Sequence, residues 1–135
     1  MSTEAFRAEV VSLIESTMTA SHPTVPVLYE NGPVIDEADI GSIFLDTDIR
    51  WYGAHLASMG PAATGRDTGA ISLQVYYKQA EGTHAVDAVI DTLRAAFKSK
   101  RIGTGVTKMP QRSVPTEFKG WYKSGLFVPF HLDTF

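Results

Sequence analysis

The chain reads SIFLDTDIRWYGAHLASMGPAATGRDTGAISLQVYY from Ser42 to Tyr77. This stretch decides the fold, because apolar residues at every second position are typical of β-strands and the pattern occurs twice. It predicts one strand over residues 42–52 and another over residues 70–77. Neighbouring strands joined in this way pair antiparallel. We therefore expect a long hairpin.

The first strand has two chemically different faces, since side chains alternate between the faces of a sheet. Its apolar face holds Ile43, Leu45, Thr47, Ile49 and Trp51. Its opposite face holds Phe44, Asp46, Asp48, Arg50 and Tyr52. The second strand adds an apolar face made of Ile71, Leu73, Val75 and Tyr77. We expect the apolar faces in the core and the charged face, bordered by aromatic rings, in water.

The connection between these strands, Gly53–Gly69, has the pattern of neither a strand nor a helix. Glycine, alanine and proline dominate it, and Arg66 and Asp67 are its only formal charges. Hairpin loops usually have about two to five residues, and a loop of more than about 12–15 residues is usually a binding element or disordered. Its length and apolar character predict a surface that becomes ordered against a partner.

Two amphipathic helices and further strands flank the hairpin. Apolar residues at helical spacing predict helices over residues 3–18 and 84–100. Alternation predicts three more strands, over residues 25–29, 106–109 and 122–132. Pro129 places the last strand at an edge or a bulge. The prediction is a single domain over residues 1–135 of the α+β class, with a mainly antiparallel sheet, two helices packed on one face and a long β-hairpin loop.

The composition is that of a globular protein, with 44% hydrophobic and 20% charged residues. A formal net charge of −3 argues against a protein that grips nucleic acid through a large basic surface. The lack of cysteine excludes disulfides, thiolate metal sites and cysteine nucleophiles. The start of the chain carries acidic residues and no long apolar run. We therefore expect neither a signal peptide nor a membrane span.

The sequence offers few groups for chemistry. The histidines, which are His22, His55, His84 and His131, do not occur at metal-ligand spacing. The zinc-protease, Walker and dinucleotide motifs are absent, and so are the common serine nucleophile motifs. We therefore predict no catalytic, cofactor-binding or metal-binding residue and no cofactor. A structural or surface role is favoured for each histidine.

Asp46 and Asp48 lie two residues apart on one strand face, and Arg50 follows them. Two carboxylates at this spacing suit a divalent cation or acid–base chemistry. The favoured interpretation is a solvated strand face with a local salt bridge, because acid–base chemistry needs further groups. A third interpretation is that these residues line an acidic channel or a subunit contact.

Five patterns follow one another along nearly the whole chain. They are a helix close to the N-terminus, VPVLYENGP at residues 25–33, the strand SIFLDTDIRWY, the block GRDTGAISLQVYYKQAEGTHAVDAVIDTLRAAF at residues 65–97, and GWYKSGLFVPFHLD at residues 120–133. Their order and spacing resemble the tail terminator proteins of long-tailed bacteriophages, also called minor tail or tail-completion proteins. The resemblance is one of strand, turn and helix patterns, and no catalytic signature contributes to it.

The resemblance implies a structural virion protein rather than an enzyme. Tail terminators form a ring, commonly of six subunits, at the head-proximal end of the tail tube. The ring ends tube polymerisation, provides the head-joining surface and leaves a channel through which DNA passes. The implied partners are further copies of the chain, the tail tube protein and a head-completion or stopper protein. Assembly would take place in the host cytoplasm, and the mature location would be the virion.

A ring of this kind requires two different patches on each subunit. We expect Leu56 and Met59 of the long connection to reach a neighbour or the tube end, with Arg66 and Asp67 as an anchor beside the strand. Asp46, Asp48 and Arg50 would line the channel or a subunit contact, as proposed above from their spacing. A negative channel wall would repel the phosphates of passing DNA.

Two other functions stay open. Another neck component, such as a stopper or head-completion protein, shares the size and the ring assembly, but it would bind capsid connectors rather than tail tubes. A small α+β enzyme using Asp46, Asp48 and His131 would require these three residues to converge in one pocket. A ligand-binding module has no supporting motif in the sequence.

Overall fold

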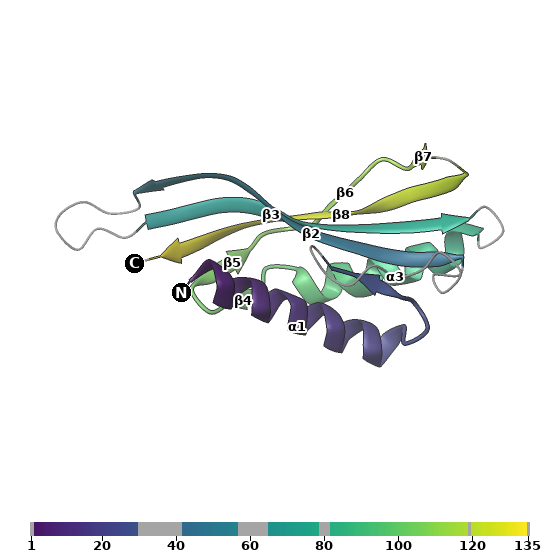
Figure 1. The fold of residues 1–135 in the computed structure, drawn as a ribbon, viewed down its shortest axis with the longest axis horizontal. Coiled ribbons are helices and arrows are strands. Elements are labelled where there is room, and N and C mark those ends of the chain that lie inside the picture. Colours follow the sequence, from purple (N-terminus) through teal and green to yellow (C-terminus); the bar gives the residue numbers. More distant parts are fainter. Residues whose placement is uncertain (1, 30–41, 57–64, 79–81, 119, 135) are drawn as a thin grey trace.

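The computed structural model describes residues 2–29, 42–56, 65–78, 82–118 and 120–134. Its helices, α1 (Thr3–Ser21) and α3 (Gly82–Phe97), lie on one face of a twisted sheet (Figure 1). The long strands are β2 (Ile43–Leu56), β3 (Gly65–Lys78) and β8 (Trp121–Thr134). The short strands are β1 (Val27–Leu28), β4 (Arg101–Ile102), β5 (Gly105–Thr107), β6 (Gln111–Arg112) and β7 (Thr116–Phe118). The predicted α+β class is confirmed.

The sheet is built around β3, which pairs antiparallel with β2 on one side and with β8 on the other. The strand order is β1-β2-β3-β8-β5-β4, and β6 and β7 also pair with β8. β1 pairs parallel with β2 at Leu45 and Asp46. The predicted hairpin of β2 and β3 is confirmed, with Leu45 opposite Val75 and Ile49 opposite Ile71.

The core lies between the sheet and the helices. Most residues predicted for this face of β2 and β3 are at most 8% exposed, namely Leu45, Thr47, Ile49, Ile71, Leu73, Val75 and Tyr77. The other two predicted residues, Ile43 and Trp51, are half-buried and pack against this core. The helices add residues at helical spacing, which are Phe6, Val10, Ile14 and Met18 from α1 and Val86, Val89, Ile90, Leu93 and Phe97 from α3. Burying each large apolar side chain contributes about 1.5–3 kcal/mol. This face therefore dominates the stability of the fold.

The helix ends are fixed by hydroxyl groups. Ser2 accepts the N–H of Ala5 at 3.1 Å and so caps α1. At the C-terminal end of α3, the Thr107 hydroxyl donates to the carbonyl of Phe97 at 2.6 Å and accepts the N–H of Lys100 at 2.7 Å. These two bonds fasten the end of α3 to β5. The helix ends at Phe97, three residues before the end predicted from the sequence.

The long connection predicted over Gly53–Gly69 is wrong at both ends. Residues 53–56 belong to β2 and residues 65–69 belong to β3. Gly65 pairs with Leu56 on one side and with Thr134 on the other, so pairing to two neighbours holds a segment with little strand propensity of its own. A β-bulge between Trp51 and Gly53 adds one residue to β2. Residues 57–64 lie outside the described part of the chain.

The edge position predicted from Pro129 is wrong, because β8 is paired on both sides. Pro129 lies where the outer neighbour of β8 changes from β5 to β6. Its carbonyl accepts the N–H of Lys108 at 2.8 Å on this outer side. The N–H and C=O of a strand residue point the same way, so the donor that proline lacks falls in the break between β5 and β6. The break allows a proline in an otherwise internal strand.

Candidate functional site

No described helix covers the second face of the long strands (Figure 1). Residues directly opposite each other in a sheet share a face, and Asp46 lies opposite Gln74, which lies opposite Gly125. The same register assigns the other members of what we call the open face. It consists of Phe44, Asp46, Asp48 and Arg50 in β2, Ser72, Gln74 and Tyr76 in β3, and Trp121, Lys123 and Phe127 in β8. The predicted charged and aromatic face is thus one part of a surface that spans three strands.

An aromatic cluster occupies one end of the open face. The rings of Phe44 and Tyr76 stack with centroids 4.9 Å apart, and the ring of Trp121 meets Phe44 edge-on at 5.3 Å. Two ammonium groups lie over these rings, Lys78 at 5.0 Å from Trp121 and Lys123 at 5.8 Å from Tyr76. The three rings are half-buried. Each has lost part of its hydration without entering the core.

The acidic pair of the open face is balanced by neighbouring cations. Arg50 forms the local salt bridge predicted for this strand, with its Nε 3.7 Å from the Asp48 carboxylate. Partial burial raises the pKa of Asp46, and the nearby Asp48 charge raises it further. Lys123 and Arg50 act in the opposite direction on the pKa of Asp46. The surface around Asp46 is therefore one of alternating charge rather than a uniformly negative wall.

A buried polar group closes the centre of the open face. Gln74 is 4% exposed and Ser72 is 2% exposed. Gln74 donates to the Ser72 hydroxyl at 3.5 Å and accepts from the Ser113 hydroxyl at 3.4 Å, while the N–H of Ser113 donates to the carbonyl of Gly125 at 2.8 Å. A Cβ on Gly125 would lie 2.1 Å from the carbonyl oxygen of Leu73. No pattern in the sequence indicates this group, because the hydrogen bond from Ser113 joins β3 to a segment 39 residues away.

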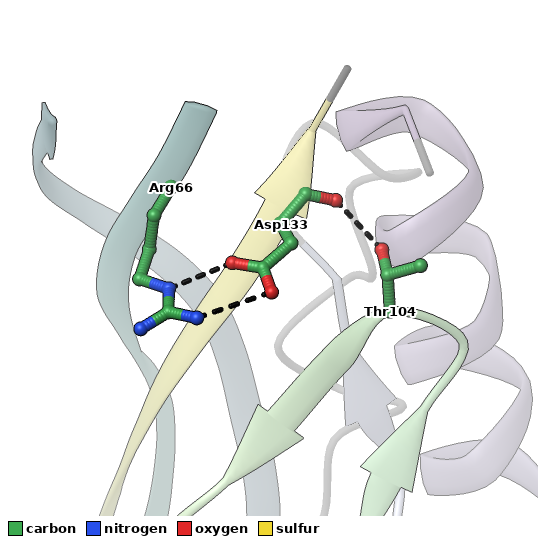
Figure 2. Close-up of polar contacts among 3 residues, drawn as sticks. All are labelled: Arg66, Thr104 and Asp133. Atoms are coloured by element: carbon green, nitrogen blue, oxygen red, sulfur yellow. Dashed lines mark hydrogen bonds and ion pairs between the residues drawn. The ribbon is translucent and has the colours of Figure 1, made fainter. Parts of the chain in front are cut away.

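A second polar group ties three chain segments together beside the β2–β3 hairpin, as Figure 2 shows. The guanidinium of Arg66 in β3 donates to both carboxylate oxygens of Asp133 in β8, at 2.7 and 3.2 Å. The Thr104 hydroxyl, between β4 and β5, donates to the backbone carbonyl of Asp133 at 2.7 Å. We call this group the Arg66 clamp. The hydrogen bond to Asp133 raises the pKa of Arg66.

The structure separates the two residues predicted to anchor the hairpin. Arg66 lies opposite Asp133 and forms an ion pair with it. Asp67 lies opposite Leu132, a core residue, and so belongs to the face of the sheet that the helices cover, which we call the helix side. Asp67 borders an open groove near the start of α1, together with Thr3, Arg7, Trp51, Tyr52, Gly53 and Ala54. Leu56, predicted to contact a partner, ends β2, while Met59 lies outside the described residues.

The three residues of the enzyme alternative do not converge. Asp46 and Asp48 lie opposite Gln74 and Ser72, whereas His131 pairs with Thr68 at the other end of β3. Gly125 is the residue of β8 that lies level with Asp46, and His131 is six positions further along β8. At the rise of a strand, six positions span about 20 Å. Within the described residues, no three histidine or carboxylate side chains form a group that suits a metal ion.

The remaining histidines have ordinary surroundings where these are described. His22 Nε2 lies 2.9 Å from the Thr92 hydroxyl, and this contact joins the end of α1 to α3. His84 is exposed on α3. Burial lowers the pKa of His131, and the Arg66 guanidinium lowers it further. The structural and surface roles expected for histidine hold for His22 and His84.

The fold has a counterpart among solved proteins. Eighteen chains of solved structures match it. One of them superposes with a TM-score of 0.75 at 16% sequence identity, over 100% of this chain and 97% of its own, and its name describes no activity. This likeness concerns the fold alone. No protein-family model and no curated protein matches the sequence. Of the helices that the structure describes, none has the length and apolar character needed to cross a membrane.

Proposed function

We propose that this chain is a tail terminator of a long-tailed bacteriophage. In this role, copies of the chain form a ring at the head-proximal end of the tail tube, with the six subunits that the resemblance implies. The ring ends polymerisation of the tube protein and offers a surface to the head-completion or stopper protein. DNA passes through its channel without specific binding. The protein acts in the virion after assembly in the host cytoplasm, and it catalyses no reaction.

The open face is the observation that carries this proposal. It holds four half-buried aromatic side chains, Phe44, Tyr76, Trp121 and Phe127, and it interleaves them with charges. Tyrosine, tryptophan, phenylalanine and arginine are the residues enriched at protein–protein interfaces. The buried side chains of Gln74 and Ser72 fill its centre. A surface of this kind suits a partner of large area better than a small molecule.

The charge pattern favours a contact between subunits over a channel wall for Asp46 and Asp48. A wall that repels DNA needs a net negative field. Here Arg50 and Lys123 lie close enough to act on the Asp46 carboxyl. Alternating charges of this kind instead fix the orientation of a partner surface.

The test is to examine the purified protein by sedimentation velocity and negative-stain electron microscopy, alone and with preformed tubes of a tail tube protein from the same virus. Rings with a central hole that cap one end of the tubes would support the proposal. Rings that bind a capsid connector and ignore tubes would identify a stopper instead. A strict monomer that ignores both partners would refute the assignment to the neck of the virion.

A further inference from the structure

The open face continues beyond Phe127 toward the end of the sheet where β2 and β3 form their hairpin. The register of β3 with β8 is unbroken along both strands, so His131 and Asp133 lie on the same face as Phe127. In this part of the face, the described residues of β3, β5 and β8 contribute no phenylalanine, tyrosine or tryptophan. The aromatic cluster is thus confined to the other end.

One row of residues crosses the sheet here from β3 to β4. His131 of β8 pairs with Thr68 of β3 on one side and with Val106 of β5 on the other. Val106 in turn pairs with Arg101 of β4. Residues that pair in this way share a face, so Arg101 lies on the open face at its outer border, where its side chain is exposed.

Two further cations lie beside this row. Lys108, which follows β5, is exposed and donates its backbone N–H to Pro129 of β8 at 2.8 Å. Arg66 lies on the other side of the row, in the Arg66 clamp. Burial lowers the pKa of His131. The charges of Arg66, Lys108 and Arg101 lower it further, so these cations lie near the imidazole. We call the side chains of Arg66, Arg101, Lys108 and His131 the cationic end of the open face.

Positive charge exceeds negative charge at the cationic end. Asp133 is the only acid among the described groups that act on His131, and it is paired with Arg66 at 2.7 Å. In the described part of the chain, no ion pair involves Arg101 or Lys108. The undescribed residues 57–64 contain no charged side chain. Because the whole chain has a formal net charge of −3, this excess of positive charge is local.

The side chains between these cations are small, and they include Thr68 and Ala70 of β3. A protein partner is usually anchored by large aromatic side chains, which the open face offers at its other end. Arginine, lysine and threonine side chains are common ligands of nucleic-acid phosphates. The cationic end therefore suits a polyanion that is held by charge and that approaches the sheet closely.

We propose that the cationic end binds the phosphate backbone of DNA through Arg66, Arg101 and Lys108, without reading the base sequence. Contacts to phosphates carry no sequence information, which agrees with the passage of DNA of any sequence through a ring. This inference deepens the proposed function, and it rests on that function for the DNA that the chain would meet. It assigns the cationic end to the channel and leaves the aromatic cluster for contacts between proteins.

The salt dependence of binding measures these contacts directly. Each phosphate contact to duplex DNA contributes about −0.9 to the slope of log K against log salt, so three contacts predict a slope of about −3. The purified protein is titrated into a fluorescently labelled duplex, and the anisotropy is recorded at several salt concentrations. We expect a weak Kd, on the order of 10⁻⁴ M at physiological salt, and tighter binding at low salt. A duplex of unrelated sequence should bind equally.

Neutral variants locate the contacts. Lys108→Gln and Arg101→Gln should each reduce the magnitude of the slope by about one, since each removes one phosphate contact. Lys78→Gln is the matched control, because it removes the same charge from an exposed side chain about 40 Å from Arg66 along β3. The control should leave the slope unchanged.

No binding at low salt, or a slope that neither Lys108→Gln nor Arg101→Gln reduces, would overturn the inference. An equal reduction in Lys78→Gln would overturn it too, because it would show a response to net charge alone. Polyglutamate that competes as effectively as an equal concentration of charge in DNA would also overturn it. That result would assign the cationic end to an acidic protein segment.

The imidazole of His131 offers an independent measurement. Burial and the three cations lower its pKa, whereas the Asp133 carboxylate raises it. A bound phosphate would act as Asp133 does, because a nearby negative charge favours the imidazolium. An NMR titration in saturating DNA should therefore give a higher pKa for His131 than the free protein does, with the exposed His84 as the control. An unchanged pKa would contradict a phosphate at this position.

The outcomes separate this inference from the proposed function. Rings that cap tail tubes, but whose subunits ignore DNA at low salt, would leave the function standing and refute the phosphate contacts. Chains that bind DNA with the expected salt dependence but never cap tubes would support the phosphate contacts and refute the function.

Discussion

The two faces of the central sheet use similar residues for different purposes. Phe130 and Phe127 lie three residues apart on β8. Phe130 is 2% exposed and packs against Phe6 and Trp51, with ring centroids at 4.7 and 5.3 Å. Phe127 is half-buried on the open face, and its ring lies 5.6 Å from the Arg50 guanidinium. Hydrophobic character alone therefore does not assign a residue to the core, and the position on the pleat decides.

The difference shows that stability and surface recognition are separated within single strands. On the helix side, apolar side chains fill the space between the sheet and the helices, where each lost methylene leaves a cavity. On the open face, aromatic rings stack on one another and lie under cations, which leaves part of each ring in water. We expect substitutions on the helix side to lower the stability of the monomer, and substitutions on the open face to act mainly on assembly.

The largest effect should come from the core phenylalanine. Phe130→Ala should lower the free energy of unfolding by about 3–5 kcal/mol, because it creates a cavity beside Phe6 and Trp51. The matched change Phe127→Ala should cost about 1 kcal/mol, since the ring is already partly hydrated. Urea unfolding of both variants measures the two values. Equal losses would contradict the separation of the two faces.

A smaller effect is expected from closing the contact between β3 and β8. Gly125→Ala should destabilise the protein by about 1–3 kcal/mol, because its Cβ would overlap the carbonyl oxygen of Leu73 and force the strands apart. Gly53→Ala serves as the control, since a Cβ there meets nothing within 4 Å. Its effect should stay within about 1 kcal/mol. Thermal unfolding of both variants would distinguish steric overlap from a general loss of glycine flexibility.

The Arg66 clamp should contribute less than either of these contacts. Its side chains are 36% and 27% exposed, so water and salt screen the ion pair. Arg66→Gln and Asp133→Asn should each lower the melting temperature slightly, and the double variant should lower it by less than the sum of the two. The coupling should shrink in high salt. Additive effects at every salt concentration would show that the two side chains act independently.

The smallest effect is a pH dependence from His131. Burial and the Arg66 guanidinium lower the pKa of its imidazole in the folded state below the value of 6.5 in the unfolded chain. The unfolded state then binds more protons, so stability falls as pH drops through 6.5 toward the folded-state pKa. Unfolding curves measured across this window should show a weaker pH dependence for His131→Gln than for the wild type. An identical dependence would place its source elsewhere.

Alternation in the sequence predicted the inner strands well, because β2 and β3 each bury one face and a shift of one residue would expose the whole apolar set. It did not predict the outer part of the hairpin. Glycine, alanine and aspartate give residues 53–56 and 65–69 little preference for a strand. Residues 65–69 are held between β2 and β8, and residues 53–56 are held by pairing with β3. The bulge at Tyr52 also interrupts the alternation.

The two polar groups could not be predicted from the sequence for a different reason. Asp46, Asp48 and Arg50 share one strand, so their spacing was enough to predict a common face and a local salt bridge. Arg66 and Asp133 are 67 residues apart, and only the register of β3 with β8 brings them together. Similarly, the sequence shows Gln74 only as one more polar residue in a strand. Its hydrogen bond with Ser113 depends on the pairing of distant segments.

The break opposite Pro129 divides the outer neighbour of β8 into separate pieces. Because β5, β6 and β7 are each two or three residues long, few hydrogen bonds hold any one of them. The amides of residues 108–118 should therefore exchange with deuterium through local opening. The paired amides of β2, β3 and β8 should exchange only through global unfolding. Peptide-resolved exchange would thus detect any partner that covers this border of the sheet, since slower exchange would be confined to that short segment.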